Sequence, residues 1–185
     1  MKPIVVFDID DILWGLVTRV TNQLNISLEK LTTFVIKECP NLTKEEIDSI
    51  YDLFNREETF ENIEWFDGVD RINNLNADVH ICSNIFRKEL GDIKLKQLIE
   101  KFPNIPIENF HLNLVVDSTK KEIPNNTFIF VDDSPYNIRD NIATHKIMLK
   151  RPWNISDDGR EILKDTPIKQ FDTFNEIMDY IESLL

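Results

Sequence analysis

The stretch Ile4-Val5-Val6-Phe7-Asp8-Ile9-Asp10-Asp11 places an apolar run directly before three carboxylates. The run is short, β-branched and aromatic, which is typical of a strand buried on both faces in the middle of a parallel sheet. Asp8 and Asp10 then lie near the carboxyl end of that strand, where open α/β sheets bind their ligands. Carboxylates packed together there are costly unless a cation neutralises them. The stretch therefore indicates a metal site, with a strand that simply runs out into an acidic loop as the alternative.

The composition is that of one soluble globular domain with room for a modest insertion, since the chain has 185 residues, 42% hydrophobic and 29% charged. Because no apolar run approaches the length of a membrane span and Met1-Lys2-Pro3 leads straight into a strand, we expect no membrane segment and no secretory signal. Cys39 and Cys82 fit no metal or redox spacing, so a cytoplasmic location is the default expectation. The net charge of −12 argues against long nucleic acid as a partner, because binding it requires neutralising phosphates with Lys and Arg.

Strand and helix patterns alternate along the rest of the chain, which predicts an α/β fold with a doubly wound, Rossmann-like parallel sheet of about five strands. The predicted strands are 4–7, 77–82, 110–116, 127–131 and 145–149. A crossover between parallel strands needs one helix, but the residues after the first strand predict three. Two lie between Ile12 and Lys37, and a third follows the capping box that Thr43 and Glu46 would form. We therefore expect a small helical cap over residues 14–66, inserted into a core domain made of residues 1–13 and 67–185.

Polar side chains close four of the predicted strands, at what should be one edge of the sheet. In chain order they are Asp8 and Asp10, Ser83, the pair Lys120 and Lys121, and the pair Asp132 and Asp133. Any one strand could end in such a turn by chance, but four of them in this order form a far more specific pattern.

The set suits phosphoryl transfer. Carboxylates from two strands can hold Mg²⁺, and a carboxylate can attack phosphorus to form an aspartyl-phosphate. A second carboxylic acid can protonate the leaving oxygen and then take a proton from the attacking water. A Ser hydroxyl and a Lys ammonium can hold the phosphoryl oxygens.

The same residues resemble the motifs of the haloacid dehalogenase superfamily of phosphatases. Val6-Phe7-Asp8-Ile9-Asp10 resembles motif I, Ile81-Cys82-Ser83 motif II, Lys120 or Lys121 motif III, and Phe130-Val131-Asp132-Asp133 motif IV. Within the superfamily, residues 131–138 and the stretch Lys150-Arg151-Pro152-Trp153-Asn154 resemble the 5'(3')-deoxyribonucleotidase branch. The small cap after the first motif agrees with that branch.

The resemblance implies a role for each matched residue. Asp8 would be the nucleophile and a metal ligand, and Asp10 the general acid/base that also ligates Mg²⁺ through its backbone carbonyl. The phosphoryl group would be bound by Ser83, Asn84 and one of the two lysines, Lys120 or Lys121. Asp132 and Asp133 would complete the metal site. The chain departs from the family at two of these positions. Asp11 stands where the family usually has Gly, and Ser134 stands where many relatives have Arg.

These expectations add up to an enzyme, a Mg²⁺-dependent phosphomonoesterase whose substrate is a small phosphorylated molecule, in the first place a nucleoside monophosphate. A non-nucleotide phosphomonoester is the main alternative, since caps determine substrate in the superfamily. A receiver-like signalling domain and an inactive binding homologue are weaker alternatives. Base, sugar and 5' or 3' preference stay open, as does a homodimer, which is common among relatives. An aromatic group in the insertion offers either a stacking surface for a base or packing for the cap: Trp14, Phe54, Phe60, Trp65 and Phe66.

Overall fold

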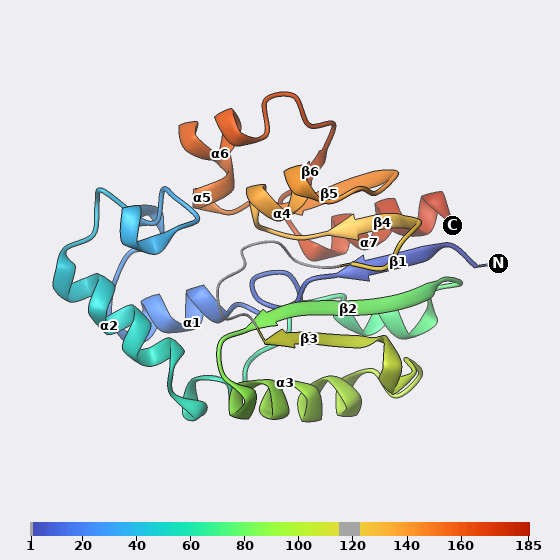
Figure 1. Ribbon diagram of the computed structural model, residues 1–185, viewed down its shortest axis with the longest axis horizontal. Coiled ribbons are helices and arrows are strands. Elements are labelled where there is room, and N and C mark those ends of the chain that lie inside the picture. Colours follow the sequence, from blue (N-terminus) through green and yellow to red (C-terminus); the bar gives the residue numbers. More distant parts are fainter. Residues whose placement is uncertain (1, 115–122) are drawn as a thin grey trace.

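In a computed structural model that describes residues 2–114 and 123–185, six parallel strands form one sheet. Their order is β3-β2-β1-β4-β5-β6, so the direction of winding reverses at β1 (Figure 1). This confirms the predicted doubly wound α/β fold. The strands are β1 (Ile4–Phe7), β2 (Asp78–Ile85), β3 (Phe110–Leu114), β4 (Thr127–Val131), β5 (His145–Leu149) and β6 (Lys169–Phe171).

The predicted bounds of β4 and β5 are confirmed, and β2 runs to Ile85 rather than to residue 82. The prediction lacked the sixth strand, β6, because three residues are too short to give a readable alternation. The last two residues of the predicted third strand, 115 and 116, lie outside the described residues.

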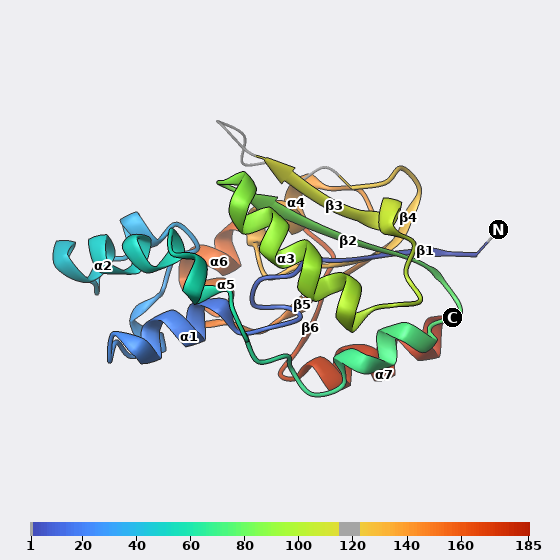
Figure 2. The same ribbon diagram turned by 90° about the horizontal axis from the view of Figure 1, so that it is seen from below.

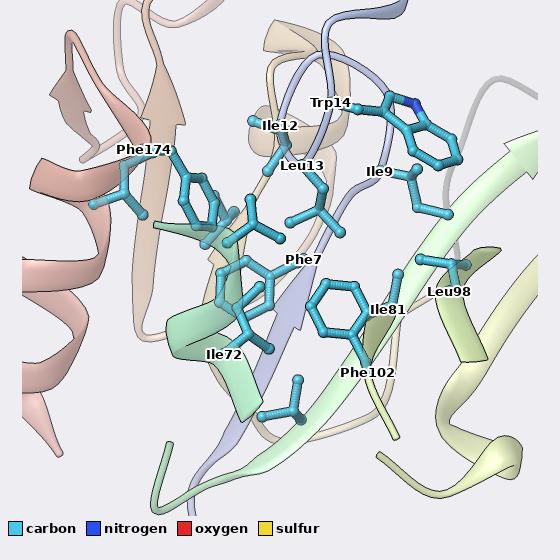
Figure 3. Close-up of a cluster of buried hydrophobic side chains, with 14 of the residues drawn as sticks. Phe7, Ile9, Ile12, Leu13, Trp14, Ile72, Ile81, Leu98, Phe102 and Phe174 are labelled. Atoms are coloured by element: carbon cyan, nitrogen blue, oxygen red, sulfur yellow. The ribbon is translucent and has the colours of Figure 1, made fainter. Parts of the chain in front are cut away.

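Strand β1 is buried on both faces, as its apolar run predicts. Val5 and Phe7 belong to one core cluster with residues of α3 (Lys88–Lys101) and α7 (Phe174–Leu184). Val6 faces the opposite side and packs with Ile138 of α4 (Pro135–Asp140). Figure 3 shows Phe7 between Ile72, Ile81, Phe102 and Phe174 in the first of these clusters.

The residues inserted after β1 form α1 (Leu16–Gln23) and α2 (Lys44–Phe54), which both lie beyond the carboxyl ends of the strands (Figures 1 and 2). Helix α2 begins with the predicted capping box of Thr43 and Glu46. The helix expected before Lys37 is wrong, because the segment forms two short 3-10 turns, Leu28–Lys30 and Ile36–Glu38. Its threonines bond locally instead, as when the Thr33 hydroxyl donates to the Val35 carbonyl at 2.9 Å.

The insertion has an apolar cluster of its own, which we call the cap cluster. It contains one residue from outside the insertion, Trp153 of α5 (Pro152–Ile155). Its buried members are Val20, Ile26, Leu31, Ile36, Cys39, Ile50, Leu53 and Trp153. The cap is therefore packed onto the core through this tryptophan.

The two ends of the insertion are joined to each other. Trp14 and Trp65 form an antiparallel bridge, and their rings lie 4.9 Å apart. The Phe66 amide donates to the Leu13 carbonyl at 2.9 Å. Trp14 and Phe60 are buried in the main core, so these two aromatic residues pack rather than offer a stacking surface. The boundaries at 13/14 and 66/67 stay a prediction.

The remaining helices complete the two layers around the sheet. A 3-10 helix, Val69–Asn74, precedes β2, and α6 (Asp157–Ile162) follows α5. Helix α7 begins with a capping box formed by Thr173 and Glu176, and its buried face carries Phe174, Ile177, Met178 and Ile181. In the described part of the chain no helix has the length and apolar character needed to cross a bilayer.

Candidate active site

The carboxyl ends of β1 and β4 bring three carboxylates together. Phe7 and Val131, the last residues of the two strands, are partners in the sheet, so Asp8 and Asp132 follow at the same level. One oxygen from each of Asp8, Asp132 and Asp133 lies within 4.8 Å of the other two. The site thus sits where the strand order reverses, the usual ligand position in this architecture.

This group of carboxylates fits a divalent cation. Asp8, Asp132 and Asp133 are 6%, 0% and 5% exposed, so water can do little to screen the repulsion between them. A cation would remove that repulsion, and carboxylate oxygens are the ligands that Mg²⁺ prefers. The donor set and its spacing therefore suit the magnesium site that the resemblance implies.

Asp133 is fixed by the first turn of α5. The Trp153 indole Nε1 donates to Asp133 Oδ2 at 2.9 Å, and the Asn154 amide donates to the Asp133 carbonyl at 3.0 Å. Trp153 is 3% exposed, so this bond is shielded from bulk solvent.

Asp132 is fixed by the first turn of α4. The Ser134 amide donates to Asp132 Oδ1 at 2.8 Å, and the Asn137 side-chain amide lies 3.2 and 3.1 Å from Oδ1 and Oδ2. Ser134 also caps α4, since its hydroxyl accepts from the Asn137 amide. Ser134 therefore stabilises the turn that carries Asp132 and Asp133.

The Asp10 carboxylate stands apart from these three. Its Oδ1 accepts from the Trp14 indole at 2.7 Å, and its Oδ2 forms an ion pair with Lys94 of α3. Sequence reasoning missed Lys94, which is 3% exposed. A signal was present, because Leu90, Lys94 and Leu98 are four residues apart and share one helix face.

Asp11 neither enters the three-carboxylate group nor faces solvent. Its backbone φ is 57°, in the left-handed region. Glycine, the usual residue at this position in the family, adopts that region without strain. Its Oδ2 accepts from the Val17 amide at the start of α1, and Arg151 donates to its carbonyl at 2.8 Å. Burial raises the pKa of Asp11 to about 7, although the positive charge of Arg151 opposes the rise. Asp11 thus connects the loop after β1 to the start of α1.

Two of the candidate phosphate-binding residues, Ser83 and Asn84, lie on β2, the neighbour of β1. Ile81 pairs with Phe7, so Ser83 and Asn84 of β2 extend past the end of β1 toward the acidic edge. Ser83 is buried, and its hydroxyl lies 3.4 Å from the Asn84 carbonyl. Lys120 and Lys121 lie outside the described residues.

Comparison with known proteins bears on the fold. No protein-family model and no curated protein sequence matches the chain. Solved structures do, among them a haloacid dehalogenase-like family hydrolase from Streptococcus pneumoniae, with a TM-score of 0.58 and 10% identity over 97% of this chain and 98% of that one. The fold is that of a haloacid dehalogenase-like hydrolase. This fold agrees with the resemblance of the sequence motifs to that superfamily.

Proposed function

We propose that the protein is a Mg²⁺-dependent phosphomonoesterase that acts through an aspartyl-phosphate on Asp8, with nucleoside monophosphates as its substrates. The observation that carries the proposal is the grouping of Asp8 with Asp132 and Asp133 at the point where the strand order of a haloacid dehalogenase-like fold reverses. The motif resemblance supplies the roles.

The metal would be held by Asp8, Asp132 and Asp133, together with the backbone carbonyl of Asp10. When bound, Mg²⁺ neutralises the carboxylates and the phosphoryl oxygens, so that one anion can approach another. The bonds from Trp153 and Asn137 hold two of the carboxylates in place before substrate arrives.

In the first step, an Asp8 carboxylate oxygen attacks phosphorus, and the bond from phosphorus to the ester oxygen breaks. Asp10 gives its proton to that oxygen, and the alcohol leaves. In the second step, water attacks phosphorus, Asp10 takes a proton from the water, and the bond to Asp8 breaks to release phosphate. Ser83, Asn84 and Lys120 or Lys121 would hold the phosphoryl oxygens in both steps.

Trp14 and Lys94 orient the Asp10 carboxylate, with one contact on each oxygen. Each carboxyl oxygen can bind a second partner, so either one could exchange a proton with the ester oxygen while these contacts persist. The side chain is 26% exposed, which leaves room for that approach.

The nucleotide as substrate is supported by the resemblance of residues 131–138 and 150–154 to the deoxyribonucleotidase branch. Placement of α1 and α2 beyond the acidic edge favours a cap that contacts the part of the substrate outside the phosphate (Figure 2). A non-nucleotide phosphomonoester would use the same chemistry and remains the second candidate, because fold alone does not set substrate.

The test is phosphate release from ribo- and deoxyribonucleoside monophosphates and from sugar phosphates, with and without Mg²⁺, for the wild type and Asp8→Asn. We expect Mg²⁺-dependent release that favours nucleotides and is lost in Asp8→Asn, while Asp165→Asn, at an exposed acid, keeps it. Release from sugar phosphates alone would discard the nucleotide and keep the mechanism. No release from any phosphomonoester would discard the proposed enzyme.

A further inference from the structure

Trp153 belongs to two parts of the molecule at once. Its ring is one of the buried members of the cap cluster, together with residues such as Leu31 and Leu53. Its indole Nε1 donates to Oδ2 of Asp133, one of the three grouped carboxylates. A single side chain therefore touches the cap on one side and the acidic site on the other.

The residues on either side of Trp153 form bonds that fix its place in the fold. The Asn154 side-chain amide donates to the carbonyls of both Asp133 and Leu149, and Asn154 is fully buried. On the other side, Arg151 donates to the Asp11 carbonyl, and its guanidinium lies 4.9 Å from the centre of the Phe66 ring. Residues 151–154 thus contact both the loop after β1, at Asp11, and the loop after β4, at Asp133.

We propose that Trp153 is a positioning residue that orients Asp133 toward the metal and makes metal affinity depend on the packing of the cap. The inference rests on the proposed function, since it takes the three carboxylates as the Mg²⁺ site. Trp153 is outside the residues to which the motifs give roles, and it connects the cap cluster with the carboxylate group.

The Asp133 carboxylate can rotate about its Cβ–Cγ bond. A donor fixed on Oδ2 sets that rotation and hence the direction in which Asp133 presents its oxygens. A neutral donor also leaves the negative charge of Asp133 in place for the cation, whereas Lys or Arg at this position would compete with the metal. An indole held by apolar packing meets both requirements, because its N–H carries no charge and its ring is locked by the cap cluster.

The experiment compares Mg²⁺ binding without substrate, by calorimetry, in the wild type, Trp153→Phe and Trp65→Phe. Trp153→Phe keeps an aromatic ring and removes the donor, and we expect its affinity for Mg²⁺ to fall by about tenfold or more. Trp65→Phe is the matched control, because its indole packs on Trp14 and Phe102 and lies outside the cap cluster, so its affinity should stay within twofold.

The outcomes separate the inference from the function on which it rests. Equal Mg²⁺ affinity in the wild type and Trp153→Phe would overturn the role of Trp153 and leave the metal site standing. No Mg²⁺ binding to the wild type would overturn both.

A second measurement on the wild type does not depend on the folding of a variant. The chain has 3 tryptophans, so its ¹H–¹⁵N spectrum has few indole signals to assign. We expect Mg²⁺ to shift the Trp153 indole signal and to leave the Trp65 signal in place. A Trp153 signal that stays unchanged while Mg²⁺ is bound would overturn the inference.

Discussion

Lys94 and Asp10 form an ion pair across 84 positions of sequence, and the lysine side chain is only 4% exposed. Helix α3 thus places the Lys94 ammonium beside Asp10, the residue proposed as the general acid/base. The Lys94 ammonium also lies 5.2 Å from the centre of the Phe60 ring. The pair connects α3, the acidic loop and the end of the insertion.

Replacing Lys94 by Met should leave the Asp10 carboxylate without its cation. We expect a loss of about 2 kcal/mol in the free energy of unfolding, less than for a fully buried pair, because 26% of the Asp10 side chain is exposed. Denaturant unfolding measures this. Lys96→Met, on the exposed face of the same helix, is the control and should change stability by about 0.5 kcal/mol or less. Equal stability of the two variants would contradict a structural role for the pair.

Mg²⁺ should stabilise the protein in the absence of substrate, because it would neutralise the buried carboxylates of the folded state only. At a free concentration 100 times the dissociation constant, the expected gain is about 2.7 kcal/mol, which corresponds to a rise of about 5–10 °C in Tm. Thermal unfolding at increasing Mg²⁺ checks this, with chelator as the reference. Asp8→Asn should lose most of the rise and Asp165→Asn should keep it; a rise of equal size in both would place the bound ion elsewhere.

Asp11 should tolerate Asn better than Ala. Asn adopts the left-handed conformation at φ 57° readily, and its side-chain oxygen can still accept from the Val17 amide. Ala has neither property, so Asp11→Ala should lose about 1–2 kcal/mol in the free energy of unfolding. Urea unfolding of both variants measures the difference. If Asp11→Ala is as stable as Asp11→Asn, the hydrogen bond from the Val17 amide to Asp11 contributes nothing to the free energy of unfolding.

His80 and His111 stack at 5.1 Å on β2 and β3, and His80 Nδ1 lies 2.8 Å from His111 Nε2. Burial, and next the charge of His80, lower the pKa of His111. A lowered pKa means that the unfolded chain binds the proton better, so stability is full above the unfolded value of about 6.5 and falls as the pH drops through it. The Asp78 carboxylate lies 3.6 Å from His80 Nε2, on the other side of that ring from His111.

His111→Gln should therefore lose less stability than the wild type between pH 7.5 and pH 5. His145→Gln is the control, because His145 on β5 contacts Phe128 and no second histidine among the described residues. Unfolding free energies at the two pH values test this. The same pH dependence in His111→Gln and in the wild type would show that the acid sensitivity comes from other groups.

Features set by local sequence were the predictable ones. The apolar run before Asp8 is enough to predict a buried parallel strand, and parallel strands bring their carboxyl ends to one edge, so Asp8, Asp132 and Asp133 could be grouped in advance. The capping boxes at Thr43 and Thr173 are local in the same sense.

Features set by packing between distant segments were not predictable. The contacts of Lys94 with Asp10 and of Trp153 with Asp133 join residues 84 and 20 positions apart, and only the folded chain makes them. The helix expected over residues 28–37 is absent for the same reason. The apolar spacing there fits a helix, but the local hydrogen bonds of the threonines and the packing of Leu31 and Ile36 favour 3-10 turns.

The bridge between Trp14 and Trp65 makes the chain leave the core and return to it at neighbouring points. The part of the segment that lies outside the main core can then change its length and sequence without moving the strands on either side. Under the proposed function, exchange of the insertion apart from Leu16, Phe60 and Ile63, which pack in the main core, would alter which molecules reach the three carboxylates while the proposed chemistry stays the same. New substrate ranges could thus arise by replacing one segment, provided that the replacement supplies a partner for the Trp153 ring.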